Sequence, residues 1–543
     1  MGDVLVAGAG PVGMMAALEL ARRGVPVRLI DAADGPATTS RAAAIHARTI
    51  EVLDQVGLHE AFEARAVPGR GIAFYADGAE LARMDATFTT QATRFEQVWF
   101  LDQVITEELL REALAAYGVG IEWGVRLIEL TENPEAVTVR LRHPDGRLEE
   151  GEVAWLVGAD GGHSVVRDQL GVRLAGESSE TWLIADAELE FAEPIEHDRI
   201  RWIRADGETV MIFPLVGEKR WRLLDTVDVA YDGDPGAVAE RFAAKLSRGL
   251  GREVTVATPS WVSVFTIQQR AVPVMQSRSG TGRPSRCFLA GDAAHVHSPA
   301  SGQGMNTGLQ DAVNLAWKLA AAARGELPTP LAAALLDSYS AERVPVGQAL
   351  LSTTQMATAL VNFRNSTVDQ HLPAVFATLH ALPQLLHALN QGFLGGMSGL
   401  AIAYPTSPLT VHDGDTTRTG PRPGQRLAQV RQADALDPSW QPVLATLREP
   451  DWTLLVAGPE TAARSLDAWR RQTWPAPTVH TVDGPAAEQL GLRAAQPAAN
   501  TPGCGLDNGP EATGWLLVRP DGYVAARGRG PAELDRSLAR IAG

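Results

Sequence analysis

The stretch Val4-Leu5-Val6-Ala7-Gly8-Ala9-Gly10-Pro11-Val12-Gly13 decides the fold of this chain. Its first residues predict a short buried strand, its glycines a tight turn, and residues 14–23 a helix with apolar side chains on one face. Gly24 is suited to cap that helix, and residues 26–30 predict a second strand that ends at Asp31. Such a strand–turn–helix–strand unit is typical of a Rossmann-like α/β domain.

The glycine spacing Gly8-x-Gly10-x-x-Gly13 predicts a binding site for a dinucleotide. Gly8 makes the turn, Gly10 lets the backbone approach a pyrophosphate, and Gly13 lets the helix pack closely on the strand. The helix, which begins near Pro11 and Val12, then presents unpaired N–H groups and the positive end of its dipole to the phosphates. The alternative is a glycine-rich turn without a ligand.

Asp31 predicts which nucleotide the turn binds. It lies 18 residues after Gly13, at the end of the second strand, where a carboxylate accepts hydrogen bonds from ribose hydroxyls. The same carboxylate would repel a 2′-phosphate. We therefore expect the adenosine of FAD or NAD here, and not that of NADP.

The composition excludes several classes of protein. The chain has 543 residues, of which 45% are hydrophobic and 21% charged, as in ordinary globular proteins. The net charge of −16 disfavours nucleic acid and anionic membranes as partners. The only cysteines, Cys287 and Cys504, cannot build a disulfide framework or a cysteine zinc site. We expect a cytoplasmic protein without a targeting or membrane-spanning segment.

Two later motifs separate FAD from NAD. Residues 156–167, Leu-Val-Gly-Ala-Asp-Gly-Gly-His-Ser-Val-Val-Arg, resemble the Asp-Gly motif of flavoprotein aromatic hydroxylases. Residues 291–306, which begin Gly-Asp-Ala-Ala-His and end Gly-Gln-Gly-Met-Asn, resemble their Gly-Asp motif. With the glycine turn these form the three-part signature of the class A flavin monooxygenases, the para-hydroxybenzoate hydroxylase family. The pattern is most similar to pentachlorophenol, phenol and aromatic-polyketide hydroxylases.

The resemblance implies roles for residues around a flavin. Asp292 would accept hydrogen bonds from the ribityl chain, and the helix after Gly302 would stabilise negative charge on the reduced ring. Arg41, on a loop that is mobile in the family, would help to position flavin and nicotinamide, and Pro299 would lie beside the reactive face of the ring. The complete set of predicted cofactor residues is Gly8, Gly10, Pro11, Val12, Gly13, Asp31, Arg41, Gln103, Asp160, Gly291, Asp292, Gly302, Gly304, Met305 and Asn306.

The pair His295-x-His297 has the appearance of a metal-binding motif. It has no cysteine beside it in the sequence, and two imidazoles alone are a weak metal signal. We therefore predict no metal site.

The resemblance also implies a reaction. NADPH or NADH reduces bound FAD, the reduced flavin reacts with dioxygen, and a C4a-hydroperoxide delivers one oxygen atom to a phenolic or polycyclic aromatic ring. Baeyer–Villiger insertion or epoxidation of an aromatic polyketide would use the same flavin motifs. The motifs are also compatible with a flavin-dependent reductase that does not use oxygen and with a non-catalytic binding module. The ring substrate, the nicotinamide and a homodimeric state stay open.

The substrate is expected beneath the antiparallel meander of residues 181–275, whose strand-like runs include residues 198–227. Trp202, Phe213 and Trp221 are the predicted substrate contacts, with ordinary sheet core as the alternative for each. The tyrosine that takes a phenolic proton in the benzoate enzyme has no obvious counterpart, because only Tyr231 falls in this region. His46 is therefore the candidate proton acceptor, and a structural histidine is the alternative.

The chain divides into five predicted segments. Residues 1–180 form the first part of the FAD-binding domain, 181–275 an inserted antiparallel-sheet substrate domain, and 276–395 the second part of the FAD-binding domain with additional helices. A linker over 396–415 leads to residues 416–543. Around Asp413-Gly414, Arg422-Pro423-Gly424 and residues 516–523, this part resembles the thioredoxin-like domain of phenol and polyketide hydroxylases. It lacks C-x-x-C, so we predict a structural or dimerisation role.

Overall fold

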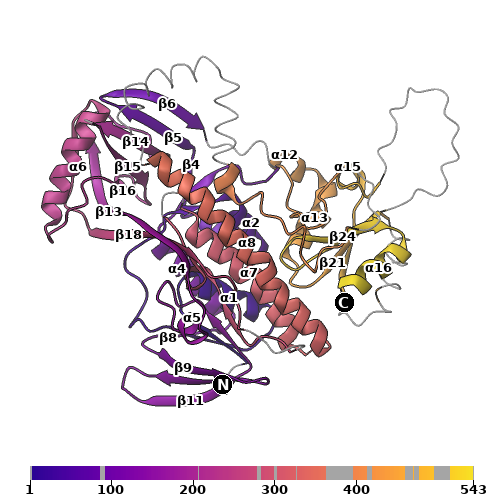
Figure 1. Ribbon diagram of the computed structural model, residues 1–543. Coiled ribbons are helices and arrows are strands. Elements are labelled where there is room, and N and C mark those ends of the chain that lie inside the picture. Colours follow the sequence, from indigo (N-terminus) through magenta and orange to yellow (C-terminus); the bar gives the residue numbers. More distant parts are fainter. Residues whose placement is uncertain are drawn as a thin grey trace, which may run out of the picture.

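The computed structural model describes residues 3–85, 92–205, 207–277, 283–298, 302–325, 327–361, 395–412, 419–458, 469, 476–493 and 514–541. Within them the chain has a mixed α/β fold, shown in Figure 1. Pro299, Cys504 and the pair Asp413-Gly414, which carried predictions, lie outside the described residues. No helix in the described part of the chain is long and apolar enough to cross a membrane.

A parallel sheet brings the three motifs to one edge. Its five described strands lie in the order β19 (Cys287–Leu289), β12 (Trp155–Gly158), β1 (Val4–Ala7), β2 (Val27–Ile30) and β8 (Ile121–Glu122). β1 pairs in parallel with β12 and β2, and all of its residues are buried, as in sheets covered on both faces. The glycine turn follows β1, the Asp-Gly motif follows β12 and the Gly-Asp motif follows β19. Because parallel strands share a carboxyl edge, these three turns meet there.

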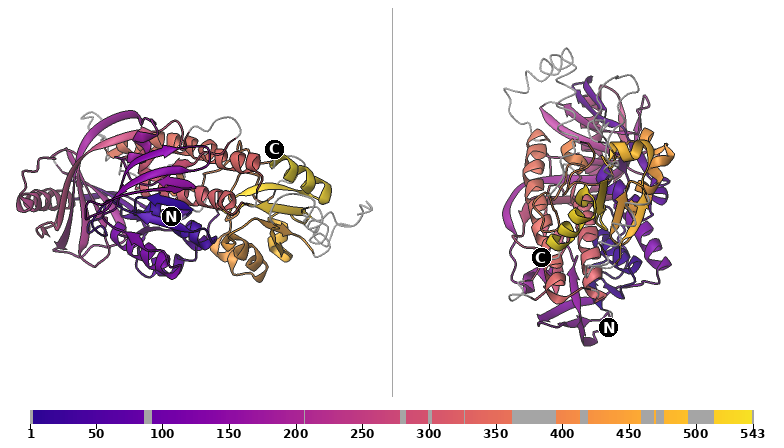
Figure 2. Two further views of the ribbon diagram at one scale, coloured as in Figure 1. Left: turned by 90° about the horizontal axis from the view of Figure 1, so that it is seen from below. Right: turned by 90° about the vertical axis from the view of Figure 1, so that its right-hand side faces the viewer.

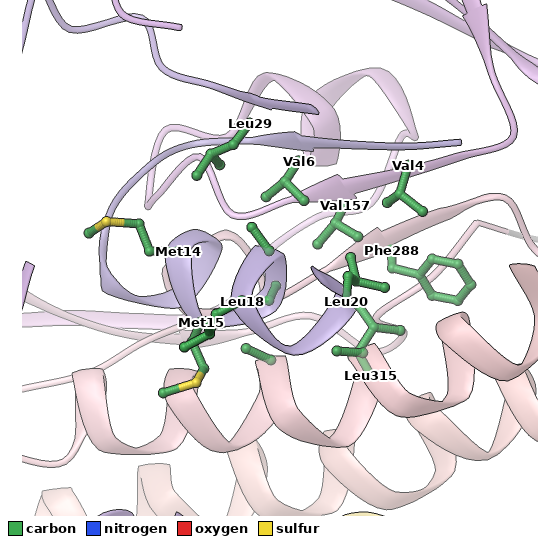
Figure 3. Packing of buried hydrophobic residues seen from close by; sticks show 14 of the residues in the cluster. Val4, Val6, Met14, Met15, Leu18, Leu20, Leu29, Val157, Phe288 and Leu315 are labelled. Atoms are coloured by element: carbon green, nitrogen blue, oxygen red, sulfur yellow. The ribbon is translucent and has the colours of Figure 1, made fainter. Parts of the chain in front are cut away.

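Helix α1 (Pro11–Arg22) forms the centre of the core below this sheet. Figure 3 shows Leu18 and Leu20 of α1 between Val6 of the sheet and Leu315 of α7 (Gly304–Ala323). Leu18 and Leu20 are 1% and 0% exposed although they lie on opposite sides of the helix, so α1 is buried on more than the one face that its apolar spacing predicts. α4 (Gln103–Ala116) also packs against α1.

A second, larger sheet covers the carboxyl edge of the first. Its nine described strands are β20 (His295–Val296), β18 (Trp261–Ala271), β13 (Ala175–Phe191), β16 (Arg220–Asp225), β15 (Glu208–Pro214), β14 (Arg199–Ala205), β5 (Gly71–Ala76) and β6 (Ala79–Asp85), with β17 (Val254–Val256) paired to β13. α6 (Pro235–Leu250) packs on the outer face (Figure 1). The antiparallel run β14–β15–β16 has the predicted meander connections.

Two strands of this larger sheet, β5 and β6, come from residues 71–85, which are predicted to belong to the FAD-binding domain. β5 pairs in parallel with β14, so residues distant in the chain become neighbours. A parallel pair needs a long crossover connection, and neither local composition nor turn residues reveal it. The sheet therefore extends beyond the predicted range of 181–275.

The C-terminal part has its own sheet, in which four strands are described. The order is β22 (Thr478–Thr481), β21 (Thr453–Val456), β23 (Gly514–Val518) and β24 (Val524–Arg529), with β21 and β22 parallel and the other pairs antiparallel. α13 (Gln441–Arg448), α15 (Gly484–Gln489) and α16 (Pro531–Ile541) accompany it. Figure 2 shows this sheet at one end of the molecule and α6 at the other.

The remaining elements connect these sheets. The strands are β3 (Ala44–Ile45), β4 (Val67–Gly69) and β7 (Val98–Phe100) in one small sheet, and β9 (Arg126–Glu132), β10 (Val137–Arg142) and β11 (Leu148–Val153) in another. The helices are α2 (Ala47–Gln55), α3 (His59–Glu63), α5 (Val165–Gln169), α8 (Thr329–Val361) and α12 (Gln432–Ala435).

The packing of α1 predicts the cost of a cavity in this core. Leu18→Ala removes a 1% exposed side chain and should destabilise the domain by about 2–5 kcal/mol. Leu148→Ala, at a 57% exposed leucine, is the matched control and should change stability by less than about 0.5 kcal/mol. The midpoint of the first thermal transition measures both. Equal midpoints for the two variants would contradict the assigned core.

Candidate functional site

A continuous cavity of about 630 Å³ runs from the glycine turn to the larger sheet. Gly8 and Gly10 line one end, and Trp202 and Phe213 line the other. Between them lie residues of the Asp-Gly and Gly-Asp turns and the start of α7. The predicted cofactor and substrate residues therefore share one space, with the exceptions described below.

The glycine turn is shaped for close approach. Gly8 has a φ of 101°, and a Cβ there would collide with the carbonyl oxygen of Ala159. A Cβ on Gly13 would collide with the carbonyl oxygen of Gly8, so α1 lies directly against the turn. Gly10 has nothing within 4 Å of its Cβ position. Gly13 itself packs behind the lining, as its predicted role requires.

α1 begins at the cavity without a side-chain cap. Its N-cap is Gly10, which has no side chain to accept a hydrogen bond from the first turn. The first N–H groups of a helix have no partner within the helix, and they lie at the positive end of its dipole. The start of α1 therefore suits a phosphate.

Asp31 is held in place by backbone N–H groups. Its Oδ2 accepts a hydrogen bond from Ala9 N at 2.6 Å and its Oδ1 one from Ala33 N at 2.8 Å. The side chain also lines the cavity. A carboxylate oxygen has more than one lone pair, so both oxygens can still accept from a ribose.

The loop that carries Arg41 is anchored to two elements. Arg222 of β16 donates to the carbonyl oxygens of Ser40 at 2.5 Å and Arg41 at 2.8 Å, while Asp186 of β13 binds its other side at 2.8 Å through both oxygens. Gln103 Oε1 accepts from Ala42 N at 3.1 Å. Gln103 therefore lines the cavity and also fixes this loop, a role that its sequence position did not indicate.

The Gly-Asp turn depends on a buried carboxylate in α7. Asp311 Oδ2 accepts from Gly291 N at 3.1 Å and from His295 Nε2 at 2.6 Å, and Asp311 Oδ1 accepts from Arg343 Nε at 2.6 Å. Burial alone would raise the pKa of Asp311, but Arg343 and His295 hold it below its usual value. This ion pair fixes the turn that presents Asp292 to the cavity.

Asp292 itself lines the cavity beside Arg41. Burial raises the pKa of Asp292, and the positive charges of His295 and Arg41 oppose that rise. Gly291 is behind the lining, because it packs against Val12: a Cβ on Gly291 would lie 2.9 Å from Val12 Cγ2. The two motif turns therefore touch each other.

Asp160 has a structural role beside its place on the cavity wall. It lines the cavity, but its carboxylate accepts hydrogen bonds from Ser164 Oγ at 2.5 Å and from Val165 N at 2.7 Å. These bonds hold the start of α5. Burial raises the pKa of Asp160, and these hydrogen bonds oppose it.

α7 presents a second uncapped start to the cavity. Its N-cap, Gln303, makes no side-chain cap, and Gly302, Gly304 and Met305 line the cavity. Asn306 lies behind them: its Oδ1 accepts from His46 N at 2.8 Å and its Nδ2 donates to Ala44 O at 2.9 Å. Asn306 therefore fixes the beginning of α2 and is not itself a lining residue.

Three histidines line the cavity, namely His46, His163 and His297. His46, the predicted proton acceptor, is 4% exposed at the N-cap of α2. His297 Nε2 lies 2.9 Å from His295 Nδ1, so the two histidines of the His-x-His pair are hydrogen bonded to each other. Burial, followed by the charge of His295, holds the pKa of His297 well below its usual value. In the described residues no group of three His, Cys, Asp or Glu side chains is arranged to hold a metal ion.

The substrate end requires one correction. Trp202 and Phe213 line the cavity, but Trp221 lies on the opposite face of the sheet, buried against α6 in a cluster with Phe242. Side chains alternate along a strand, so in β16 Arg222 and Leu224 face the cavity and Trp221 does not. The strand itself was predictable from its residues, but the identity of the element covering each face was not.

Several lining residues were missed. Ile184, Met211, Arg222 and Leu224 come from the larger sheet, whose period-two alternation would reveal them once the face is known. Met397 also lines the cavity, although it lies in the segment predicted as a linker. Because Met397 is far from the flavin motifs in the sequence, no pattern around it indicated that it lines the cavity.

These features fit FAD. Two uncapped helices begin at one cavity, an anchored carboxylate lies at the end of β2, and Gly10 leaves open space where the backbone must be approached. A dinucleotide with two phosphates and a ring that becomes anionic on reduction needs such positive ends.

A family model described as FAD binding domain matches residues 1–354. The chain belongs to this family.

Relatives that match nearly the whole chain indicate which reaction the family catalyses. The chain is 44% identical to 6-methylpretetramide 4-monooxygenase of Streptomyces rimosus, over 97% of this chain and 91% of that protein. It is 29% identical to pentachlorophenol 4-monooxygenase of Sphingobium chlorophenolicum, over 98% and 94% of the two chains. The solved structure of CabE, an aromatic hydroxylase from angucycline biosynthesis, has a TM-score of 0.71 and 28% identity, and the match covers 100% and 99%. This chain is a FAD-dependent aromatic monooxygenase of a family that typically consumes NADPH or NADH.

The open space at Gly10 predicts how flavin binding in this monooxygenase can be abolished. Gly10→Glu should fold, since nothing lies within 4 Å of the new Cβ, but its carboxylate would enter the phosphate site. We expect the FAD dissociation constant to rise at least about a hundredfold, or ~2.7 kcal/mol. Flavin fluorescence on dilution of the holoenzyme measures it. Gly120→Glu, also in open space but away from the cavity, is the control, and retained yellow colour in Gly10→Glu would refute the assignment.

Proposed function

We propose that this monooxygenase hydroxylates a polycyclic aromatic polyketide of the pretetramide type at a phenolic ring. The observation that carries the proposal is the 44% identity to 6-methylpretetramide 4-monooxygenase, which extends over 97% of the chain. A match of that extent includes the residues of the larger sheet as well as the flavin motifs. Anhydrotetracycline monooxygenase, also from Streptomyces rimosus, is 33% identical over 74% of the chain.

The composition of the cavity supports a fused-ring substrate. Beyond the flavin motifs its wall is largely apolar, with Trp202 and Phe213 contributing aromatic faces. The other apolar lining residues there are Ile72, Val98, Phe100, Ile184, Ile200, Met211, Leu224 and Met397. Flat aromatic ligands bury much of their surface in such sites, and few polar groups orient them. An apolar wall also excludes water from the reacting ring.

Bound FAD supplies the oxygen-transfer chemistry, with dioxygen and NAD(P)H as co-substrates. The chain binds and orients the reacting groups. In this proposal the start of α1 holds the pyrophosphate, Asp31 holds the ribose, and the start of α7 stabilises negative charge on the ring. Arg222 and Asp186 keep the Arg41 loop against the cavity. The proposal also gives Pro299 the position beside the reactive face of the flavin ring that the family resemblance implies.

A phenolic substrate must lose its proton to become a better nucleophile, and we assign the accepting atom to the imidazole of His46. The backbone N–H of His46 donates to Asn306 Oδ1, and this hydrogen bond fixes the position from which the His46 side chain extends along the cavity wall. His297 is a poor candidate for this role, because burial lowers its pKa and His295 Nδ1 lies 2.9 Å from its Nε2.

The domain organisation belongs to the same proposal. The order β22-β21-β23-β24, with one parallel and two antiparallel pairs, supports a thioredoxin-like domain without a dithiol. A structural or dimer-forming role is then left for it. The single described cysteine, Cys287, is buried and forms no disulfide, which is compatible with the cytoplasm.

The proposal is tested by NAD(P)H oxidation in air with the FAD-loaded protein and a panel of phenols and polycyclic polyketides. We expect a tetracyclic phenol to stimulate oxidation and to yield a product one oxygen atom heavier, with the new hydroxyl on a phenolic ring. If the product of this mass is a lactone or an epoxide, the reaction is Baeyer–Villiger insertion or epoxidation and not hydroxylation. Stimulation by simple phenols alone would overturn the polyketide assignment.

The role of His46 predicts a specific kinetic change. His46→Gln keeps a polar side chain but cannot accept a proton at neutral pH, so kcat should fall about a hundredfold, within the range for a lost general base. KM should change little, and raising the pH should restore activity as the substrate ionises by itself. His59→Gln, at a histidine packed against Phe95 outside the cavity, is the control. A pH profile unchanged from the wild type would remove His46 from the mechanism.

A further inference from the structure

The turn between β23 and β24 is buried, although hairpin turns usually lie at the surface. It comprises Arg519, Pro520, Asp521, Gly522 and Tyr523, and we refer to it as the 519–523 turn. Arg519 and Asp521 are each 2% exposed, and Tyr523 is 3% exposed. Two charged side chains at the end of a hairpin are therefore inserted into the FAD-binding part of the molecule.

On one side the 519–523 turn is bonded to α7 and α8. Arg519 Nη1 donates to Glu342 Oε1 at 2.6 Å and Arg519 Nη2 to Glu342 Oε2 at 2.8 Å. Lys318 of α7 donates to the same carboxylate at 2.7 Å. Asn314 of α7 donates to Asp521 Oδ2 at 3.2 Å. Two positive and two negative side chains compensate one another here, as buried charges require.

On its other side the 519–523 turn contacts α2. Arg48 Nη2 donates to the carbonyl oxygen of Asp521 at 3.3 Å, and its guanidinium lies 5.1 Å from the centre of the Tyr523 ring. Gly522 packs against Gln55, and a Cβ on Gly522 would collide with the Gln55 amide nitrogen. The turn is thus seated between α2 and α7.

Both helices begin at the flavin cavity. α2 starts after His46, α7 starts at Gly304, and Asn306 joins their first turns through His46 N. A change in the spacing of α2 and α7 would therefore change the cavity wall. Closely packed interiors transmit such shifts, because they have little free volume to absorb them.

We propose that the 519–523 turn is a positioning element for the flavin cavity: the C-terminal sheet holds α2 and α7 at the separation that FAD binding requires. This assigns a function to the C-terminal part beyond the monooxygenase reaction itself. It concerns the cofactor site, so it does not depend on the identity of the ring substrate.

Two glycines provide a matched test. Gly522 and Gly530 have φ values of 78° and 75°, so alanine at either position brings the same left-handed backbone strain. Gly522→Ala additionally displaces the side-chain amide of Gln55 on α2, whereas nothing lies within 4 Å of the Cβ position at Gly530. Tyr523→Leu is a second test, because it removes the ring beneath Arg48 while keeping an apolar side chain. Leu516→Ala, in the core of the C-terminal sheet, is its control for lost domain stability.

The readouts are the FAD dissociation constant, from flavin fluorescence on dilution of the holoenzyme, and the visible circular dichroism of the bound flavin. Both are measured without substrate, at a temperature below the first thermal transition of every variant. We expect Gly522→Ala and Tyr523→Leu to raise the dissociation constant about tenfold and to alter the flavin dichroism. Gly530→Ala and Leu516→Ala should stay within about twofold of the wild type, even where their melting temperatures fall.

Two results would overturn the proposal. One is wild-type FAD affinity in Gly522→Ala and Tyr523→Leu. The other is a loss of affinity that follows melting temperature equally across all four variants, which would reduce the turn to a docking surface. Neither result bears on the hydroxylation proposal, which is decided by the product that the wild-type protein forms.

Discussion

The contact between Gly13 and the carbonyl oxygen of Gly8 is the constraint on which the flavin site depends. With only hydrogen on the Gly13 Cα, α1 lies directly against the turn that precedes it. The first N–H groups of α1 then reach the cavity, and Val12 reaches Gly291 in the Gly-Asp turn. The three motif turns converge because no side chain fills the space between them. The apolar packing of α1 between the sheet and α7 holds this arrangement.

Buried ion pairs fix the loops of the flavin site whose positions the glycine contacts do not determine. Asp311 and Arg343, both fully buried, fix the Gly-Asp turn, and Asp186 and Arg222 fix the Arg41 loop. In each case an acidic and a basic residue pair directly, and the spare hydrogen-bonding groups reach backbone atoms of a loop. Breaking such a pair leaves an uncompensated buried charge, which costs about 3–5 kcal/mol. The loops of this site are therefore held by electrostatic contacts as well as by packing.

Local sequence was sufficient for the parts of the site that follow strand ends. Gly8, Gly10 and Asp31 are identified by spacing alone, because a turn between a strand and a helix dictates their geometry. The family resemblance added Asp292 and Arg41, which line the same cavity. Asp311, Arg222 and Met397 were not predicted, because their contacts join segments far apart in the chain. Trp221 was misplaced because alternation along a strand leaves open which of its faces another helix will cover.

The two uncapped helices have a consequence for the protein before it meets its cofactor. The N-cap residues of α1 and α7, Gly10 and Gln303, accept no hydrogen bond from their helices through a side chain, and FAD is the anion suited to both helix starts. A ligand that binds only the folded state stabilises it by mass action, by about 2.7 kcal/mol at a hundredfold excess over its dissociation constant. The melting temperature of this protein is then partly a property of its surroundings, because the folded chain is less stable when FAD is scarce.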